Sequence, residues 1–169
     1  FTRSTPFLGG GDIPRPYYEI MDPFLVLTAA AVATTTLKVG TGVCLIYQRD
    51  PIHTLKMVSS IDQLSNGRLD MGVGRGISPY EVGTYGIKAS DTREMFEEGL
   101  EILLKGLTQE RLSHEGKWYR IPDMPLELQP AQRPTPPLWY GGGDERGANF
   151  AARYGMHFVT LGGSARVAG

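Results

Sequence analysis

Apolar residues recur along the chain with two spacings, one typical of helices and one of strands. Helical spacing over residues 52–64 and 96–107 predicts two helices that each bury one side. Shorter apolar stretches bounded by glycine and proline predict strands that are apolar on both faces, as in a buried parallel sheet. The stretches expected to be strands are residues 37–46, 68–74, 137–143 and 157–162.

Sequence signals for helix starts occur at three aspartates. Asp22 and Asp50 are each followed by proline, which combines an N-cap residue with a residue favoured at the first helical position. Asp91 with Glu94 has the spacing of a capping box. Helices are therefore expected to begin at these three points, and a fourth helix is expected within residues 145–155.

The predicted elements alternate between helix and strand over most of the chain. This order predicts an α/β fold with a parallel sheet and helices on its outer face, in a single domain over residues 1–169. Residues 75–90 are expected to form a polar loop. Residues 110–136 interrupt the alternation as an excursion, with a short hairpin at 111–121 followed by a proline-rich segment.

Composition narrows the classes of function. The chain has 169 residues, 41% of them apolar, and a formal net charge of −1. This near-neutral balance gives no support for binding to nucleic acid or to a membrane surface. No apolar run approaches the roughly 18 residues of a membrane span. The interpretation is a globular domain that acts on a small molecule.

Cysteine and histidine usage gives no sign of a metal site or a nucleophile. Cys44 is the one cysteine, which favours a reducing cytoplasm and the role of a small buried hydrophobic residue. The histidines are far apart, so no metal-ligand spacing is present. His53 is expected to be neutral and partly packed, and His114 to be solvated in the hairpin.

Glycines gather where the predicted strands end. In parallel α/β folds, ligands bind at the carboxyl ends of strands, and glycine there lets main chain approach a flat ligand. The alternative is that glycine merely favours turns. A dinucleotide fingerprint is not matched, because the third glycine of "GVGRGI" comes one residue early and no helix follows directly. The clusters are Gly40 and Gly42, Gly72, Gly74 and Gly76, Gly141 to Gly143, and Gly162 and Gly163.

Several motifs together resemble the luciferase-like monooxygenase superfamily, in particular its branch of coenzyme F420-dependent oxidoreductases. They are "TLKVGTGV", "RDPIHT", "SIDQLSNGRLDMGVGRG", "REMFEEGLEIL", "EGKWYRI", "PPLWYGGG" and "GANFAARYG". They occur in family order and extend over nearly the whole chain. The most specific is D-x-L-S-x-G-R-x-x-x-G-V-G-x-G, at residues 62–76.

The resemblance implies a partial TIM (β/α)₈ barrel in which this chain supplies strands three to six. A complete barrel needs about 250 residues, so the first two and last two strands are expected to lie outside this chain. Four strands cannot close a barrel. A free fragment would therefore present two sheet edges and the apolar interior face.

The resemblance also implies a flavin-type cofactor, F420 or alternatively FMN, at the carboxyl ends of the strands. A bulge after the third barrel strand would support the ring, with a cis bond expected between Gly42 and Val43. Arg75 is expected either to pair with a phosphate or carboxylate or to form a surface ion pair. The residues expected to bind the cofactor are Thr41, Gly42, Val43, Cys44, Gly74, Arg75, Gly76, Gly141, Gly142 and Gly143.

The expected activity is F420-dependent hydride transfer to or from a small organic substrate. The alternatives are an FMN-dependent monooxygenase that uses oxygen, and a relative or fragment that binds no flavin. The family's Glu-His pair would precede Phe1 and its phosphate-binding loops would follow Gly169, so the catalytic residues are unassigned and the fragment alone is expected to be inactive. His157 is expected only to begin a strand. The full-length protein is expected to be a cytoplasmic homo-oligomer.

Overall fold

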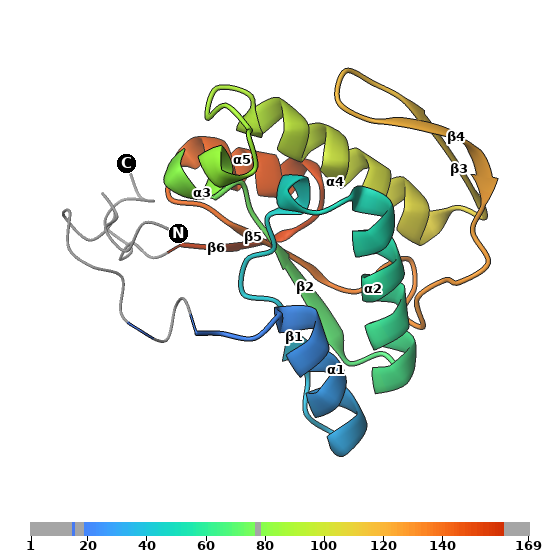
Figure 1. Ribbon diagram of the computed structural model, residues 1–169. Coiled ribbons are helices and arrows are strands. Elements are labelled where there is room, and N and C mark those ends of the chain that lie inside the picture. The colour runs from blue at the N-terminus through green and yellow to red at the C-terminus, as the bar shows by residue number, and fades with distance from the viewer. Residues whose placement is uncertain (1–14, 16–18, 77–78, 161–169) are drawn as a thin grey trace.

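The computed structural model describes residues 15, 19–76 and 79–160. Its four-stranded sheet is parallel throughout, with strand order β1-β2-β5-β6 (Figure 1). The predicted parallel sheet is thereby confirmed, while Gly162 and Gly163 lie outside the described residues. The elements are α1 (Pro23–Ala33), β1 (Val39–Gly40), the 3₁₀ helix η3 (Ile46–Gln48), α2 (Pro51–Ser65), β2 (Leu69–Val73), α3 (Pro79–Thr84), α4 (Thr92–Thr108), β3 (Arg111–Glu115), β4 (Arg120–Pro125), β5 (Leu138–Gly141), α5 (Glu145–Arg153) and β6 (His157–Val159).

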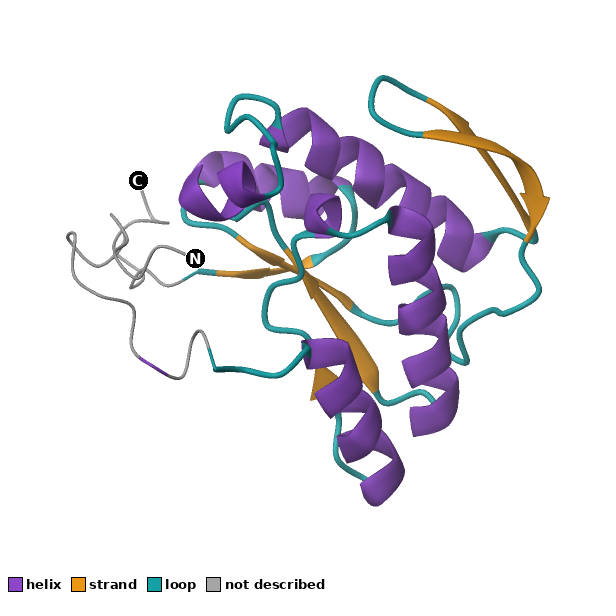
Figure 2. Cartoon of the chain, viewed as in Figure 1, coloured by secondary structure: helices purple, strands orange, loops and turns teal. Residues whose placement is uncertain are grey.

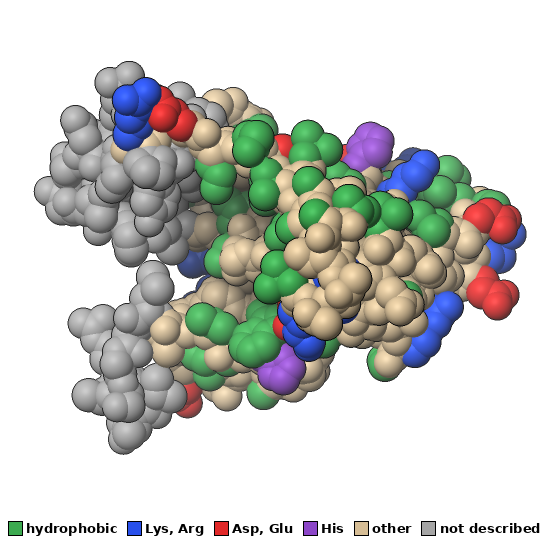
Figure 3. Space-filling model, turned by 90° about the horizontal axis from the view of Figure 1, so that it is seen from below, with side chains coloured by type: hydrophobic (Ala, Val, Ile, Leu, Met, Phe, Trp, Pro, Cys, Tyr) green, Lys and Arg blue, Asp and Glu red, His purple; other side chains and the backbone are tan. Residues whose placement is uncertain are grey.

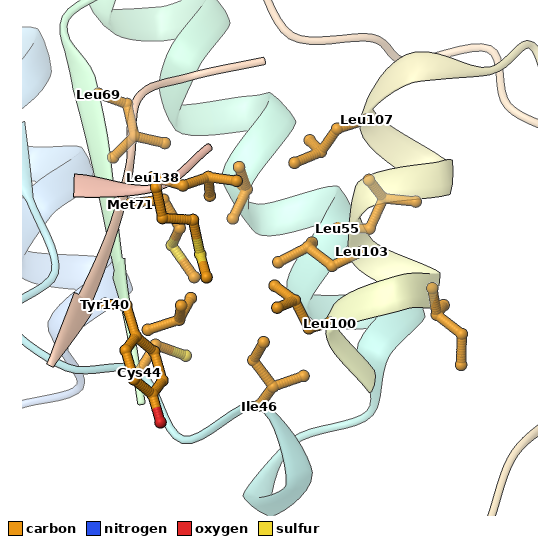
Figure 4. Close-up of a cluster of buried hydrophobic side chains, with 14 of the residues drawn as sticks. Cys44, Ile46, Leu55, Leu69, Met71, Leu100, Leu103, Leu107, Leu138 and Tyr140 are labelled. Carbon is orange, nitrogen blue, oxygen red and sulfur yellow. The ribbon is translucent and has the colours of Figure 1, made fainter. Parts of the chain in front are cut away.

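The main core lies between the sheet and helices α2 and α4. Figure 4 shows side chains of β2 and β5 pointing toward leucines of these two helices. Alternate residues of β2 are completely buried on this side, as strand geometry requires. Each large aliphatic side chain buried in this way stabilises the fold by about 1.5–3 kcal/mol. The labelled residues are Cys44, Ile46, Leu55, Leu69, Met71, Leu100, Leu103, Leu107, Leu138 and Tyr140.

All three predicted helix starts are confirmed, and at two of them the aspartate side chain caps the helix. The Asp22 carboxylate accepts a hydrogen bond from Phe24 N at 2.9 Å, and that of Asp50 accepts one from Ile52 N at 2.9 Å. The predicted capping box at Asp91 is wrong. Asp91 already has helical dihedral angles and its side chain bonds no helix amide; instead it accepts from Ser90 Oγ at 2.9 Å.

Two other predictions are corrected. The strand expected over residues 37–46 is regular only at Val39–Gly40, because the chain then leaves the ladder in a bulge. The loop expected over residues 75–90 contains the short helix α3. The helical pattern was missed there because Gly83 and the polar residues around it favour a loop by composition alone.

The excursion forms the predicted antiparallel hairpin, β3 with β4, which lies apart from the main sheet (Figure 2). The Glu98 carboxylate on α4 attaches the hairpin by accepting hydrogen bonds from Tyr119 N at 2.8 Å and Trp118 N at 3.1 Å. His114 Nε2 lies 3.1 Å from the same carboxylate, and its side chain is only 7% exposed. The expectation that His114 is solvated is therefore wrong.

Residues 62–76, which carry the most family-specific motif, mainly connect elements of the fold to one another. Asp62 is completely buried, and its carboxylate accepts hydrogen bonds from Gln132 N at 2.8 Å and Gln132 Nε2 at 2.7 Å. Asn66 ends α2 with φ 55° and Gly67 follows with φ 76°, conformations in the left-handed region that asparagine and glycine tolerate. This segment fixes how α2 turns into β2 and ties the end of the excursion to α2.

The predicted exposure of an apolar sheet face is only partly confirmed. β1 and β6 are the sheet edges, and on the face away from the core Val43 and Val159 are 54% and 46% exposed. However, that face also carries glycine, Asp70 and His157. More apolar surface belongs to α1, where Leu25 and Val32 are 72% and 63% exposed. In Figure 3, hydrophobic side chains are spread over the middle of the view and charged ones gather toward the hairpin end.

Candidate cofactor-binding site

A bulge at residues 41–43, between β1 and the point where the chain pairs with β2 again at Cys44, forms the centre of the candidate site. Gly40 pairs with Asp70 and Cys44 with Val73, so four steps along one chain oppose three along the other. Cys44 N then rejoins the ladder by donating to Gly72 O at 2.8 Å. The one extra residue pushes the 41–43 segment out of the sheet. The bulge implied by the family resemblance is therefore present.

The Thr41 side chain anchors this bulge. Its hydroxyl donates to Gly72 O at 2.8 Å and accepts from Gly72 N at 2.9 Å, replacing the ladder bonds that the bulge removes. The cis bond expected between Gly42 and Val43 is not found, since the cis bond recorded among the described residues joins Arg133 to Pro134. With the Thr41 hydroxyl making both bonds to Gly72, the bulge is accommodated by trans peptides.

Three of the strand-end glycines make room for the bulge itself. A Cβ added to Gly72 would lie 2.5 Å from the Gly42 oxygen and closer still to the Thr41 oxygen. Added to Gly74 or Gly141, it would lie 2.6 Å or 3.2 Å from a methyl group of Val43. The sequence-based interpretation that a ligand fills this space is therefore corrected: the protein's own bulge fills it. These glycines let the bulge carry Val43 over β2 and β5.

The remaining glycines divide into two groups. Gly142 packs against the Phe158 ring, and Gly76 has φ +73° and lies against Leu45, so internal packing and backbone conformation account for both. Apart from the adjoining residues, a Cβ added to Gly42 or Gly143 would meet no atom of the described residues within 4 Å. At these two glycines the main chain is not covered by neighbouring atoms. Together with the exposed side of Val43, it could lie against one side of a planar ligand.

A cavity of about 240 Å³ adjoins the bulge. Its walls are residues 41–45, Pro23 and Phe24 at the start of α1, and Gln48 and Arg49. Arg49 Nη2 lies 2.5 Å from Asp22 Oδ2, and the hydrogen bond from this guanidinium lowers the pKa of the Asp22 carboxyl. The ion pair thus joins the start of α1 to the segment after the bulge, a contact that the two N-cap signals alone did not reveal.

Cys44 behaves as the small buried residue expected from the sequence. It is 7% exposed, and burial raises the pKa of its thiol to about 11. Only about 0.1% of such a thiol is ionised at pH 8. Because the thiolate is the reactive form, Cys44 is poorly placed to act as a nucleophile.

This burial predicts that Cys44 reacts slowly with a thiol reagent. At pH 8 we expect alkylation of the native protein by iodoacetamide to be at least about 100-fold slower than after unfolding in urea. Mass spectrometry at timed intervals measures both rates. Equal rates in the two states would contradict the burial of this thiol.

Arg75 does not form the predicted surface ion pair with any described residue. Its main-chain oxygen accepts a hydrogen bond from the Tyr47 hydroxyl, which fixes the chain after β2. Burial raises the pKa of the Tyr140 phenol, and the nearby Arg75 charge opposes that shift. The second predicted role of Arg75, pairing with a phosphate or carboxylate, stays a prediction.

A larger groove of about 1040 Å³ lies elsewhere, between α4 and the hairpin. Its walls carry charged residues of both signs, including Glu97, Glu101, Lys105 and Arg120. Because it lies on the outer side of α4, away from the strand ends, it lacks the open main chain of the bulge. We therefore place the candidate site at the smaller cavity.

The described residues contain neither a cluster of metal ligands nor a helix that could span a membrane. No group of three or more histidine, cysteine, aspartate or glutamate side chains in residues 15, 19–76 and 79–160 is arranged to hold a metal ion. Among the helices described, none combines the length and apolar character needed to cross a membrane.

Comparison with known proteins identifies relatives of this chain. The family model described as "Luciferase-like monooxygenase" matches residues 10–168. An uncharacterized protein of Sinorhizobium fredii, y4vJ, is 34% identical over 145 residues, which are 85% of this chain and 41% of that protein. The oxygenase component of the flavin-dependent trigonelline monooxygenase of Acinetobacter baylyi is 29% identical over 138 residues, 80% of this chain and 38% of that protein.

Solved structures share the fold. Monooxygenase RslO1 from Streptomyces bottropensis matches with a TM-score of 0.77 and 30% identity, over 81% of this chain and 42% of its own. The oxygenating constituent of 3,6-diketocamphane monooxygenase from Pseudomonas putida, solved with FMN, matches with a TM-score of 0.76 and 23% identity, over 88% of this chain and 45% of its own. An F420-dependent secondary alcohol dehydrogenase, solved with an F420-acetone adduct, matches with a TM-score of 0.73 and 22% identity, over 83% of this chain and 43% of its own. The chain thus spans less than half the length of these proteins, as expected of part of a barrel.

Proposed function

The chain belongs to the luciferase-like monooxygenase family, and from this premise we propose that the full-length protein is a redox enzyme that binds a flavin or deazaflavin against the 41–43 bulge. The observation that carries the proposal is the Val43 side chain, which is held over Gly74 and Gly141 yet is 54% exposed. Val43 also lines the cavity beside the bulge, and small-molecule sites are concave and lined mainly by apolar side chains.

The residues of this chain would position the cofactor. Val43 and the main chain at Gly42 and Gly143 would lie against the plane of the ring, because no side chain projects there. The two hydrogen bonds between Thr41 and Gly72 would keep this support from moving when the ligand binds. When bound, F420 exchanges a hydride with substrate, whereas reduced FMN activates oxygen.

Two candidate activities follow. The first is F420-dependent hydride transfer with a small organic substrate, in keeping with the motifs of the sequence and the fold shared with the F420-dependent alcohol dehydrogenase. The second is an FMN-dependent monooxygenase, which is favoured by the names of RslO1 and of the trigonelline enzyme. Both need the same support for a tricyclic ring.

Cofactor titration of the full-length protein tests this proposal. We expect fluorescence quenching of F420 or of FMN with micromolar or tighter affinity, and oxygen consumption only if reduced FMN is the partner. Val43→Asp should weaken binding by about 10-fold or more, because a carboxylate would be buried under the ring. The melting temperature should change little, since Val43 is exposed.

Leu128→Asp is a matched control, because Leu128 is 41% exposed on the excursion and far along the chain from the bulge. This variant should bind the cofactor as the unmodified protein does. Absence of binding to both F420 and FMN by the unmodified protein would contradict the proposed function. Equal affinities for Val43→Asp and Leu128→Asp would contradict the proposed position of the ring.

Three further statements belong to the proposal. The isolated 169-residue chain should bind cofactor weakly or not at all, because the bulge supports only one side of a ring. A single buried thiol, Cys44, favours a reducing compartment such as the cytoplasm. The uncharged α1, with Leu25 and Val32 exposed, supports association of the full-length protein into a homo-oligomer.

A further inference from the structure

A pair of stacked rings, Trp139 and His157, lies on the same face of the sheet as Val43. Residues of a strand point alternately to its two faces. Tyr140 belongs to the core on the helix side, so its neighbours Trp139 and Gly141 face the other way. Gly141 is the residue that Val43 covers, and this identifies the face.

Strand pairing places the two rings level with Gly72, two residues below Gly141, which Val43 covers. Gly72 pairs with Trp139, and Trp139 pairs with His157, so the three positions form one row across the sheet. Gly141 comes two residues later, which puts the row about 7 Å below it toward the amino ends of the strands. The bulge, Trp139 and His157 therefore make a continuous wall of this face.

Stacking holds the imidazole of His157 in place, but the ring has no hydrogen-bond partner in the described part of the chain. Its ring stacks on the Trp139 indole with centroids 4.4 Å apart and an angle of 29°. Its side chain is exposed, and within the described residues its ring nitrogens make no hydrogen bond. Lys38 and Asp70 also lie on this face, 3.5 Å from each other as an ion pair.

In a closed barrel this face points inward, where polar groups are nearly always hydrogen-bonded. We propose that His157 is a binding residue that hydrogen-bonds the redox cofactor resting on Val43, and that Trp139 orients its imidazole by stacking. This inference rests on the proposed function and adds a specific polar contact to it. A flavin or deazaflavin offers ring carbonyl and nitrogen atoms as partners, and neutral imidazole can both donate and accept.

The test compares two substitutions in the full-length protein. His157→Phe keeps a ring that can stack on Trp139 but removes the nitrogens, whereas His157→Gln keeps a hydrogen-bonding group. We expect His157→Phe to weaken binding of F420 or FMN by about 3–10-fold and to shift the absorption spectrum of the bound cofactor. His157→Gln should retain most of the affinity. The melting temperature of the cofactor-free protein should be unchanged by His157→Phe.

His53→Phe serves as the matched control. The His53 side chain is 81% exposed on α2, so the expectation that it is partly packed is wrong, and its substitution should not affect binding. Unchanged affinity and spectrum in His157→Phe would overturn the inference while leaving the proposed function intact. A loss of melting temperature that accompanies the loss of affinity would also overturn it, by making His157 a packing residue bonded to the rest of the barrel. If the unmodified protein binds neither F420 nor FMN, both proposals fail together.

Discussion

Substitution of Gly72 by alanine should abolish tight cofactor binding and destabilise the protein by about 3 kcal/mol. The added methyl group would meet two main-chain oxygens, those of Thr41 and Gly42, and main chain cannot rotate away as a flexible side chain can. The bulge would have to move outward, which breaks the two Thr41 hydrogen bonds and displaces Val43. Titration with F420 and FMN and urea unfolding of the full-length protein measure both effects.

Gly83→Ala is the matched control for this prediction. A Cβ added at Gly83 in α3 would meet nothing within 4 Å, so stability and binding should both be preserved. Thr41→Val tests the anchor without a substitution at Gly72, since it replaces the hydroxyl by a methyl group of similar size that cannot hydrogen-bond. This variant should also weaken binding. Normal affinity in Gly72→Ala would show that the position of the bulge does not determine where the ring binds.

Local sequence signals predicted much of the fold because their physical causes are local. The N-caps Asp22 and Asp50 accept hydrogen bonds from amides two or three residues later in the chain. The helix starts can therefore be predicted from the sequence alone. The prediction failed at residues 37–46, where the apolar pattern continues although the main chain leaves the ladder. That departure depends on Gly72, which lies some thirty residues away in sequence.

The sequence predicted where the bulge lies but not what the glycines beside it face. Strand-end glycines correctly marked the edge where the bulge lies. Whether such a glycine faces a ligand, a side chain or a neighbouring peptide depends on tertiary packing, however, and here Gly72 and Gly74 face the bulge. The Trp139–His157 stack was missed for a similar reason, because only the register between β5 and β6 brings these residues together.

The most family-specific motif carries a contact that also could not be foreseen. Arg68 follows the turn after α2, and its guanidinium reaches the end of α1, more than thirty residues earlier. It donates to Ala31 O at 2.7 Å and to Thr34 O at 2.9 Å, and also to Leu37 O. Ala31 lies in the last turn of α1, where helix carbonyls lack partners within the helix, Thr34 is the C-cap, and Leu37 lies in the segment that follows. Arg68 therefore acts as a C-cap supplied by another element.

Replacing Arg68 by alanine should lower the free energy of unfolding by about 2–4 kcal/mol, because charge-assisted hydrogen bonds are lost and helix-end carbonyls lose their donors. Arg68→Lys should recover only part of this stability, since an ammonium group cannot match the fork of a guanidinium. Chemical denaturation of the full-length protein measures the difference. Because α1 also holds Asp22 against Arg49, the loss should loosen the wall of the bulge cavity and weaken cofactor binding.

Arg111→Ala provides the comparison that isolates this effect. Arg111 also makes several hydrogen bonds, with Nη2 2.6 Å from Asp123 Oδ2, but both side chains are exposed on the hairpin and solvent screens their attraction. Its removal should leave stability and binding almost unchanged. If Arg68→Ala were no more damaging than Arg111→Ala, the guanidinium would not be what secures α1. In that case, packing of Phe24 and Ala31 and the Asp22–Arg49 ion pair would be what holds the helix.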